Sequence, residues 1–545
     1  APYAKNIFGN TPEMINFFSD ILNYKYPWSK YSQIVVRDYV SGAMENTTAT
    51  IFMEALQVDD RELLDKNWDG IIAHELFHHW FGDLVTSESW SNLPLNESFA
   101  NYSEYLWAEH KYGVDEADYL GEKEKEEYYA EAATKQEPLI RYHYKDREDM
   151  FDRHSYNKGG RVLHMLRKLV GDEAFFSALN HYLKKNEYTS VEIHDLRLAL
   201  EDVTGEDYNW FFNQWFLSPG HPELQVSHSY VSGVLRLKIS QIHDTTYTPV
   251  YRIPLKVEVW ANGEKKIHNV TLDKANQEFM LPVPYMPQMV NIDADNSLLA
   301  IVNHKKSKDE LIFQYNNSER YLLRYAALKE LFAPIPNATE KPTSAFGEAK
   351  TRDLLAKALE DKFWVIRELA LSQFSQYAIP EVQSYMKKIE QIALADTKPE
   401  TRARAIYLLS SFDNKAYKHV YEKGLNEKPY SIVGASLSSY LKTQPSDAPK
   451  VAQEYEKYDN LNILLALGDY YTDVKDKSKY PWFKENMNTG DGQKLYNFMN
   501  AFGQYLMVID GPEKEDGKKI LEKIAAENKH EVIRETAKAY LQYVK

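Results

Sequence analysis

His74-Glu75-Leu76-Phe77-His78, with Glu97 nineteen residues beyond the second histidine, is the stretch from which the fold and the chemistry of this chain can be predicted. Two histidines at positions i and i+4 of a helix point from one face, so their rings can meet at one metal ion. Glu75 lies about 100° around that helix, where it can reach a water on the metal. Glu97 would add a third ligand from a second helix. Two His and one Glu leave a fourth position open, which is typical of a catalytic zinc site.

The helix that carries this motif is predicted to be buried, because its sequence is apolar nearly all round. Buried His and Glu side chains need polar partners, and a metal ion supplies one. His79 lies about 140° from His74 around the helix, off the ligand face, so we expect a packed or hydrogen-bonded ring there. The apolar residues are Ile71, Ile72, Ala73, Leu76, Phe77, Trp80 and Phe81.

A second motif, Gly42-Ala43-Met44-Glu45-Asn46, follows the strand-like run 33–37. Alone it is a turn with a carboxylate. Together with the His-Glu-x-x-His motif and Glu97 it resembles the exopeptidase motif of the aminopeptidase-N family of zinc metallopeptidases. The resemblance continues in residues 78–86, Asn96-Glu97, Phe151-Asp152 and 156–166, and it covers most of residues 11–220.

The resemblance implies one Zn²⁺ per chain, held by His74, His78 and Glu97. Glu75 would be the general base, and Tyr156 would donate its hydroxyl to the oxyanion. A free α-amine needs a fixed carboxylate, and Glu45 fits that task. Small side chains at Gly42 and Ala43 let an extended substrate approach the backbone, and Met44 and Asn46 complete the substrate-binding motif. In the outer layer, Glu104 is expected to hold a zinc-bound His, or to be an ordinary solvated glutamate, and Asn96 to orient Glu97.

The sequence also departs from the family pattern. Pro94 stands where an aromatic residue is usual, and Ser98 replaces the glycine after the third ligand. Members of the family normally begin with a β-rich domain, whereas this sequence starts inside the catalytic domain without a signal-peptide pattern. We therefore expect a truncated, processed or trimmed product. Glu45 then binds the amine alone or with a carboxylate from another chain that carries the N-terminal β domain.

Composition narrows the function classes. The net charge of −15 over 545 residues argues against nucleic acid and acidic membrane surfaces as partners. No apolar run approaches the length of a membrane span. The absence of cysteine excludes disulfides and thiolate ligands. We expect a periplasmic, envelope or secreted bacterial protein, with a cytoplasmic one as the alternative.

The predicted fold is multidomain α+β with three parts. A thermolysin-like, mostly helical catalytic domain is expected over 1–220, up to the breaker cluster Ser218-Pro219-Gly220-His221-Pro222. Apolar alternation and an Asn262-Gly263 turn predict a small antiparallel β-sandwich over 221–305. Residues 306–545 are helical again.

A short repeat runs through that third part. Arg-x-x-Ala-x-x-x-Leu/Phe begins at Arg324, Arg367, Arg402 and Arg534. This spacing predicts a HEAT- or armadillo-like α-solenoid, in which each Arg pairs with a neighbouring repeat.

The sequence is thus interpreted as a zinc aminopeptidase that removes single residues from peptides with a free amino end. Three alternatives remain open. One is a thermolysin-like endopeptidase, and a second is an epoxide hydrolase of related fold. The third is a catalytically incomplete scaffold or peptide-binding fragment.

Overall fold

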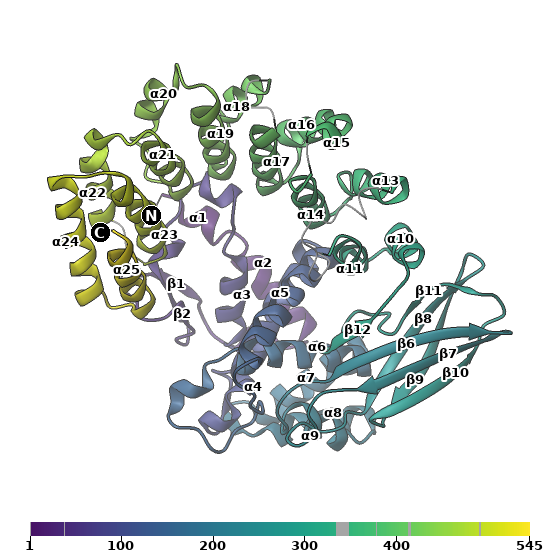
Figure 1. Cartoon of the computed structure of the whole chain (residues 1–545). Helices are drawn as coiled ribbons and strands as arrows, with labels where there is room; N and C mark the ends of the chain where they lie inside the picture. The colour runs from purple at the N-terminus through teal and green to yellow at the C-terminus, as the bar shows by residue number, and fades with distance from the viewer. Residues whose placement is uncertain are drawn as a thin grey trace. The chain divides into compact units, whose positions relative to one another are not determined.

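The computed structural model describes residues 2–37, 39–333, 348–377, 379–412, 416–489 and 492–544. The chain forms two compact units, coloured by residue number in Figure 1. The first comprises Ala1–Val58 and Asn67–Ile335, and the second comprises Asp59–Lys66 and Pro336–Lys545. None of the helices in these described ranges is long and apolar enough to span a membrane.

The N-terminal part of the first unit is mostly helical, with a small sheet beside it. Strand β3 lies at the centre of this sheet, parallel to β1 and antiparallel to β2. Proline in the first turn starts α2 and α4, where its missing N–H is not needed. The elements are α1 (Ala4–Ile7), α2 (Thr11–Ile21), β1 (Ser32–Val35), β2 (Ala43–Met44), β3 (Ala49–Phe52), α3 (Asp69–Phe77), β4 (Val85–Ser87), α4 (Pro94–Lys111), α5 (Val114–Ala132), a π-helix (His154–Lys158), α6 (Gly159–Val170), α7 (Asp172–Asn186), β5 (Thr189–Val191), α8 (Ile193–Thr204) and α9 (Asn209–Trp215).

An aromatic stack fixes α3 against its neighbours. The Phe81 ring, just beyond α3, lies 5.0 Å from that of Phe77 and 4.2 Å from that of Phe99 on α4. Tyr182 on α7 extends the stack, 6.1 Å from Phe81. All four side chains are almost fully buried. Such stacked pairs add to the hydrophobic stabilisation from burial, so the two helices with the expected zinc ligands are held in fixed relation.

The second half of the first unit is a pair of sheets, ordered β10-β7-β6-β12 and β11-β8-β9. Side chains of β7 and β8 alternate inward into the same core. The predicted hairpin is confirmed: β8 and β9 are paired, and Asn262 and Gly263 between them have φ of 52° and 79°. The strands are β6 (Glu223–Val231), β7 (Val234–Gln241), β8 (Ile253–Ala261), β9 (Glu264–Leu272), β10 (Asn276–Pro282), β11 (Pro287–Asn291) and β12 (Ile301–His304).

One strand pair departs from the antiparallel prediction. Strand β12 runs parallel to β6, because a long connection brings it back to the free edge of the first sheet in the direction of β6. Beyond it, α10 (Lys308–Asn317) and α11 (Tyr321–Leu331) also belong to the first unit. Arg320, just before α11, makes two hydrogen bonds of 2.7 and 2.6 Å to Asp118 on α5.

The second unit is a succession of helices. Helices α16, α17, α19, α21 and α23 pack in that order, each against the next. Two arginines of the predicted repeat pair with following elements: Arg367 binds Asp396 at 2.6 Å, and Arg402 binds Glu427 at 2.8 Å. The helices are α13 (Ala349–Ala358), α14 (Trp364–Phe374), α15 (Ile379–Val382), α16 (Met386–Ala395), α17 (Pro399–Phe412), α18 (Lys418–Gly424), α19 (Tyr430–Thr443), α20 (Ala448–Tyr455), α21 (Leu461–Asp473), α22 (Tyr480–Thr489), α23 (Gly492–Val508), α24 (Pro512–Glu527) and α25 (Glu531–Tyr543). The HEAT or armadillo assignment stays a prediction.

The segment Asp59–Lys66 belongs to this helical unit although its flanks belong to the first. The Arg61 guanidinium lies 4.1 Å from the ring centre of Tyr430, whose hydroxyl donates to Asp59 at 2.8 Å. Asp65 accepts from the backbone N–H of Ser431 at 3.0 Å. These contacts tie the segment to the start of α19.

Candidate zinc and substrate site

Three of the residues singled out in the sequence meet at one point. His74 lies on α3, His78 follows its last turn, and Glu97 lies in the first turn of α4. Both His Nε2 atoms are 3.3 Å from Oε2 of Glu97. Candidate ligand atoms of the three residues all lie within 4.8 Å of one another. Two imidazoles and one carboxylate in this arrangement fit a zinc ion.

The outer nitrogen of each histidine is also engaged. Nδ1 of His74 lies 3.0 Å from Oε1 of Glu104, and Nδ1 of His78 lies 3.0 Å from the carbonyl oxygen of Phe81. Acceptors at Nδ1 favour the tautomer whose Nε2 lone pair faces the shared point. The sequence left two roles open for Glu104, and this geometry favours the one in which its carboxylate holds His74.

The electrostatics of the cluster reflect its burial. Burial would lower the pKa of His78, but the carboxylates of Glu45 and Glu97 raise it to about 9, so a metal ion bound there would displace the proton from Nε2. Burial would raise the pKa of Glu97, yet the two histidines hold it well below the usual range. Burial raises the pKa of Glu75 to about 7, against the lowering effect of His74 and His78 and with a smaller contribution from Glu45 and Glu97.

Glu75 is placed for proton transfer. Its side chain is buried, and Oε2 has no hydrogen-bond partner among the residues that the structure describes. A pKa near 7 suits a group that must both accept and release a proton at neutral pH.

Glu45 lies next to this cluster. Carboxylate and imidazole atoms of Glu45, Glu75 and His78 lie within 4.8 Å of one another. Strand β2, which precedes Glu45, is an edge strand, so its outer backbone groups are left unpaired by the sheet. The backbone on the other side of the Gly42–Asn46 motif is already paired, because the carbonyl of Gly42 accepts from the Met53 N–H at 3.0 Å. Asn46 closes the turn by accepting from Ala49 N–H at 2.7 Å.

Tyr156 faces the ligands from the π-helix. Its ring is stacked on that of His74, with centroids 5.9 Å apart and planes 8° from parallel. Burial, and then the Glu97 carboxylate, raise the pKa of Tyr156. The hydroxyl therefore keeps its proton at neutral pH and can donate it in a hydrogen bond.

The support beneath Tyr156 went unnoticed in the sequence. Asp152 accepts from the backbone N–H groups of His154 and Ser155 at 3.1 and 2.9 Å. Arg141, eleven residues earlier in the chain, pairs with both oxygens of Asp152, at 2.7 and 3.1 Å. Asp152 was visible as part of the Phe-Asp motif, but nothing in the sequence identified Arg141 as its partner.

The two departures from the family pattern have structural roles. Pro94 is the first residue of α4. The Ser98 hydroxyl donates to the carbonyl of Ser155 at 2.7 Å. A Cβ at Gly159, the first residue of α6, would lie 1.8 Å from Ser98 Oγ, so α4 and the start of α6 approach this closely because residue 159 is glycine.

Asn96 and His79 make other contacts than metal ligation. Asn96 Oδ1 accepts from Ser87 N–H at 3.3 Å, which ties it to β4; its role in orienting Glu97 stays a prediction. The buried His79 ring accepts from Thr48 N–H at 3.0 Å, and its Nδ1 lies 3.2 Å from the Glu75 carbonyl. Burial lowers the pKa of His79 to about 4, so the ring is neutral. It joins α3 to the turn that follows Glu45, in line with the expectation of a hydrogen-bonded ring.

The site opens into a cavity of about 1160 Å³. Besides the groups above, it is lined by Trp90 and Phe151, which belong to the motifs of the resemblance, and by Glu88 and Arg147, which the sequence did not single out. Carboxylates outnumber cations in the lining, so the cavity favours a positively charged ligand group. A third cluster, Glu131, Asp152 and His154, is a poor metal site, because Arg141 and Lys135 already neutralise Asp152.

Comparison with known proteins gives the same family as the motifs. Residues 7–215 match the peptidase family M1 domain. A leucyl aminopeptidase of Saccharolobus solfataricus is 27% identical over 430 residues, which are 76% of this chain and 52% of that protein. A probable aminopeptidase 2 of Sulfurisphaera tokodaii is 24% identical over 91% of this chain and 60% of its own length. Aminopeptidase N of Lactococcus lactis is 34% identical over 38% of this chain and 26% of its own length.

A solved structure agrees in fold. The aminopeptidase A of Legionella pneumophila, crystallised with aspartic acid, superposes with a TM-score of 0.69 over 98% of this chain and 73% of that one, at 15% identity. The chain covers less than two thirds of the length of each of the three sequence relatives.

Proposed function

Because this chain belongs, through residues 7–215, to the aminopeptidase-N family of zinc metallopeptidases, we propose that it hydrolyses the N-terminal residue from peptides in a zinc-dependent reaction. One observation carries the proposal: Glu45 shares a cluster with Glu75 and His78, whose polar atoms lie within 4.8 Å of one another. A carboxylate this close to a zinc ligand blocks a substrate peptide that has further residues on the amino side of the bound one. It accepts a free ammonium group instead. An endopeptidase has no use for it.

In the proposed reaction, Glu45 binds the α-ammonium group by a charge-assisted hydrogen bond. The edge of β2 aligns the peptide backbone as an added strand. His74, His78 and Glu97 would hold the zinc ion. A zinc ion held there supplies polarisation of the scissile carbonyl and acidifies a bound water.

Glu75 then accepts a proton from the attacking water and delivers it to the leaving amine nitrogen. Its buried, unpaired Oε2 and its pKa of about 7 suit both steps. Tyr156 donates its hydroxyl to the carbonyl oxygen as negative charge develops there. Asp152 keeps Tyr156 in place through the backbone of the π-helix.

The test uses matched amino-acid p-nitroanilides with a free or an N-acetylated amine, with and without a chelator. We expect chelator-sensitive hydrolysis of the free-amine set alone. Cleavage of the acetylated set would overturn the proposal in favour of an endopeptidase. Zinc binding without turnover of either set would favour an inert scaffold.

A variant sharpens this test. Glu45→Gln keeps the shape but removes the charge that binds the ammonium group. We expect KM for free-amine substrates to rise about 10- to 100-fold, with bound zinc unchanged. Glu88→Gln, which removes an exposed carboxylate from the same cavity, is the matched control and should leave KM within about twofold.

A further inference from the structure

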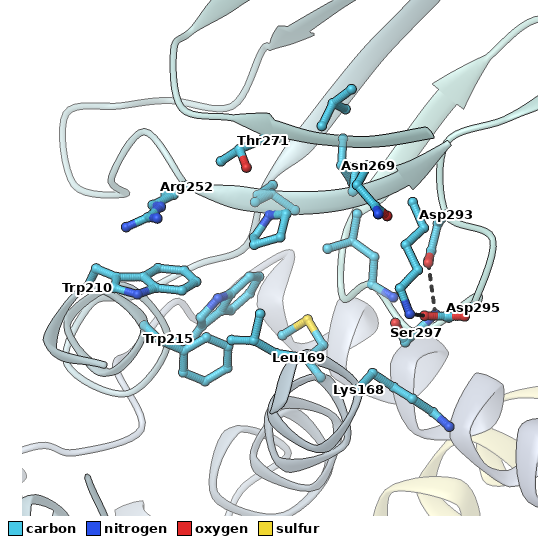
Figure 2. Close-up of a pocket in the computed structure, with 18 residues that line it drawn as sticks. Lys168, Leu169, Trp210, Trp215, Arg252, Asn269, Thr271, Asp293, Asp295 and Ser297 are labelled. Atoms are coloured by element: carbon cyan, nitrogen blue, oxygen red, sulfur yellow. Dashed lines mark hydrogen bonds and ion pairs between the residues drawn. The ribbon is translucent and has the colours of Figure 1, made fainter. Parts of the chain in front are cut away.

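A second cavity, of about 330 Å³, lies within the first unit and shares no lining residue with the zinc site. Helices α6 and α9 form one wall and strands β8 and β9 the other, as Figure 2 shows. The loop 293–298 closes one end. This volume is at the small end of the range for ligand pockets.

The wall of this cavity is apolar and aromatic. Trp215 and Phe211 from α9 are almost fully buried beneath it, and Leu169 from α6 lies beside them. Trp210 forms the wall at the end opposite loop 293–298. Aromatic and aliphatic side chains of this kind bind the apolar body of a small molecule.

Both aspartates at the loop end already have partners. Lys256 pairs with Asp295 at 2.6 Å. Asp293 accepts from the backbone N–H groups of Ser297 and Leu298 at 3.2 and 2.8 Å. The amino group of Lys168 points away from the cavity in Figure 2. This end therefore offers little net attraction to a charged ligand.

Arg252, at the opposite end, differs. Its guanidinium lies 4.6 Å from the ring centre of Trp210, and it has no ion pair among the residues that the structure describes. Its backbone is held by Gln214, through two hydrogen bonds of 2.9 Å. When a guanidinium lies over an aromatic ring, its N–H donors stay free in the guanidinium's own plane. They can then bind a carboxylate as a fork. Arg252 therefore places a positive charge beside the apolar wall of the cavity.

We propose that this cavity binds a small organic carboxylate with an aromatic or branched apolar body. The body packs against Trp215, Trp210 and Leu169, and the carboxylate pairs with Arg252. An amine of the same shape is disfavoured, because Arg252 repels it and both aspartates are engaged. The inference is independent of the peptidase activity.

Isothermal titration calorimetry with three probes of one shape tests it: 3-phenylpropionate, 3-phenylpropan-1-ol and 3-phenylpropylamine. We expect the carboxylate to bind about tenfold tighter than the alcohol, and the amine more weakly than either. Equal binding of acid and alcohol, tighter binding of the amine, or no binding of the acid at millimolar concentration would each overturn the proposal.

Two variants locate the binding. Arg252→Gln should lower the affinity for the carboxylate about tenfold and leave that for the alcohol unchanged. Val270→Phe fills the cavity from β9 and should abolish binding of both. Arg236→Gln, an exposed arginine of β7 outside the cavity, is the matched control.

If Val270→Phe lowers the melting temperature, Arg252→Gln alone decides, and unchanged carboxylate affinity in that variant would refute the site. Binding is measured in the Glu45→Gln background, which removes the carboxylate proposed to bind an ammonium group at the zinc site, so that the amine probe reports on the second cavity and failure here is separable from failure of the proposed peptidase.

Discussion

The first unit contains two clusters, each with two histidines and one glutamate, and the side chains of the two clusters are arranged differently. In the first cluster, His74 and His78 direct their Nε2 atoms to the same oxygen of Glu97, each at 3.3 Å. In the second cluster, the groups form a line. Nδ1 of His228 lies 2.9 Å from Nε2 of His304, and Nε2 of His228 lies 3.2 Å from Oε1 of Glu310.

The backbone explains the difference. Histidines one helical turn apart point from the same face and converge. His228 and His304 lie on the neighbouring parallel strands β6 and β12. Their rings are adjacent there, and one nitrogen of each ring contacts the other ring. The same residue types therefore make a candidate metal site in one place and a contact with the start of α10 in the other.

The largest expected effect is loss of the metal. His78→Ala removes a converging ligand, and we expect bound zinc to fall from one equivalent to nearly none and kcat/KM to fall about 1000-fold or more. His228→Gln should leave both unchanged. Metal content after dialysis and turnover measure this. Zinc loss in the His228 variant would show that the linear cluster also binds metal.

The second-largest effect is expected at Glu75, the proposed general base. Glu75→Gln should lower kcat about 100- to 10,000-fold while bound zinc is retained, since Glu75 does not ligate it. Glu310→Gln, the corresponding change in the linear cluster, should leave kcat near wild type. Turnover of Glu75→Gln at the wild-type rate would rule out its assigned role.

A smaller effect is expected at Glu104, which holds His74. Glu104→Gln should weaken zinc affinity about 10- to 100-fold, with kcat of the zinc-saturated enzyme changed little. Competition with a chromogenic chelator measures the affinity. Asn96→Ala is the control, because its hydrogen bond goes to Ser87. A larger loss in Asn96→Ala than in Glu104→Gln would reverse the order of the two roles.

The smallest effect concerns stability in acid. Burial would raise the pKa of Glu310, but His228 and the backbone N–H of Ser307 lower it to about 2, from an ordinary value of 4.5. A carboxylate with a depressed folded-state pKa stabilises the fold above its unfolded pKa, and this stability is lost as pH falls from about 4.5 to about 2. Glu310→Gln should therefore flatten the fall in melting temperature over that window, and an unchanged slope would contradict the assignment.

The sequence was informative wherever spacing along one helix or strand determines geometry. The i, i+4 histidines and the Asn262-Gly263 hairpin are of this kind. Contacts between distant segments had no such signal. The Ser98–Ser155 hydrogen bond and the second cavity arise from packing between elements far apart in sequence. Arg141 meets Asp152 across eleven residues that follow no single helix or strand spacing. Asn96 shows the same limit, since nothing in the sequence indicated its hydrogen bond to Ser87 of β4.

The segment Asp59–Lys66 has a consequence for the order of events during synthesis. Its partners Tyr430 and Ser431 leave the ribosome about 365 residues later, which at 5 to 20 residues per second takes roughly 20 to 70 s. Throughout this interval, Arg61 and its flanking carboxylates have no site to dock on. The helical unit can be completed only late, whereas α3, α4 and the aromatic stack between them have all their residues available long before.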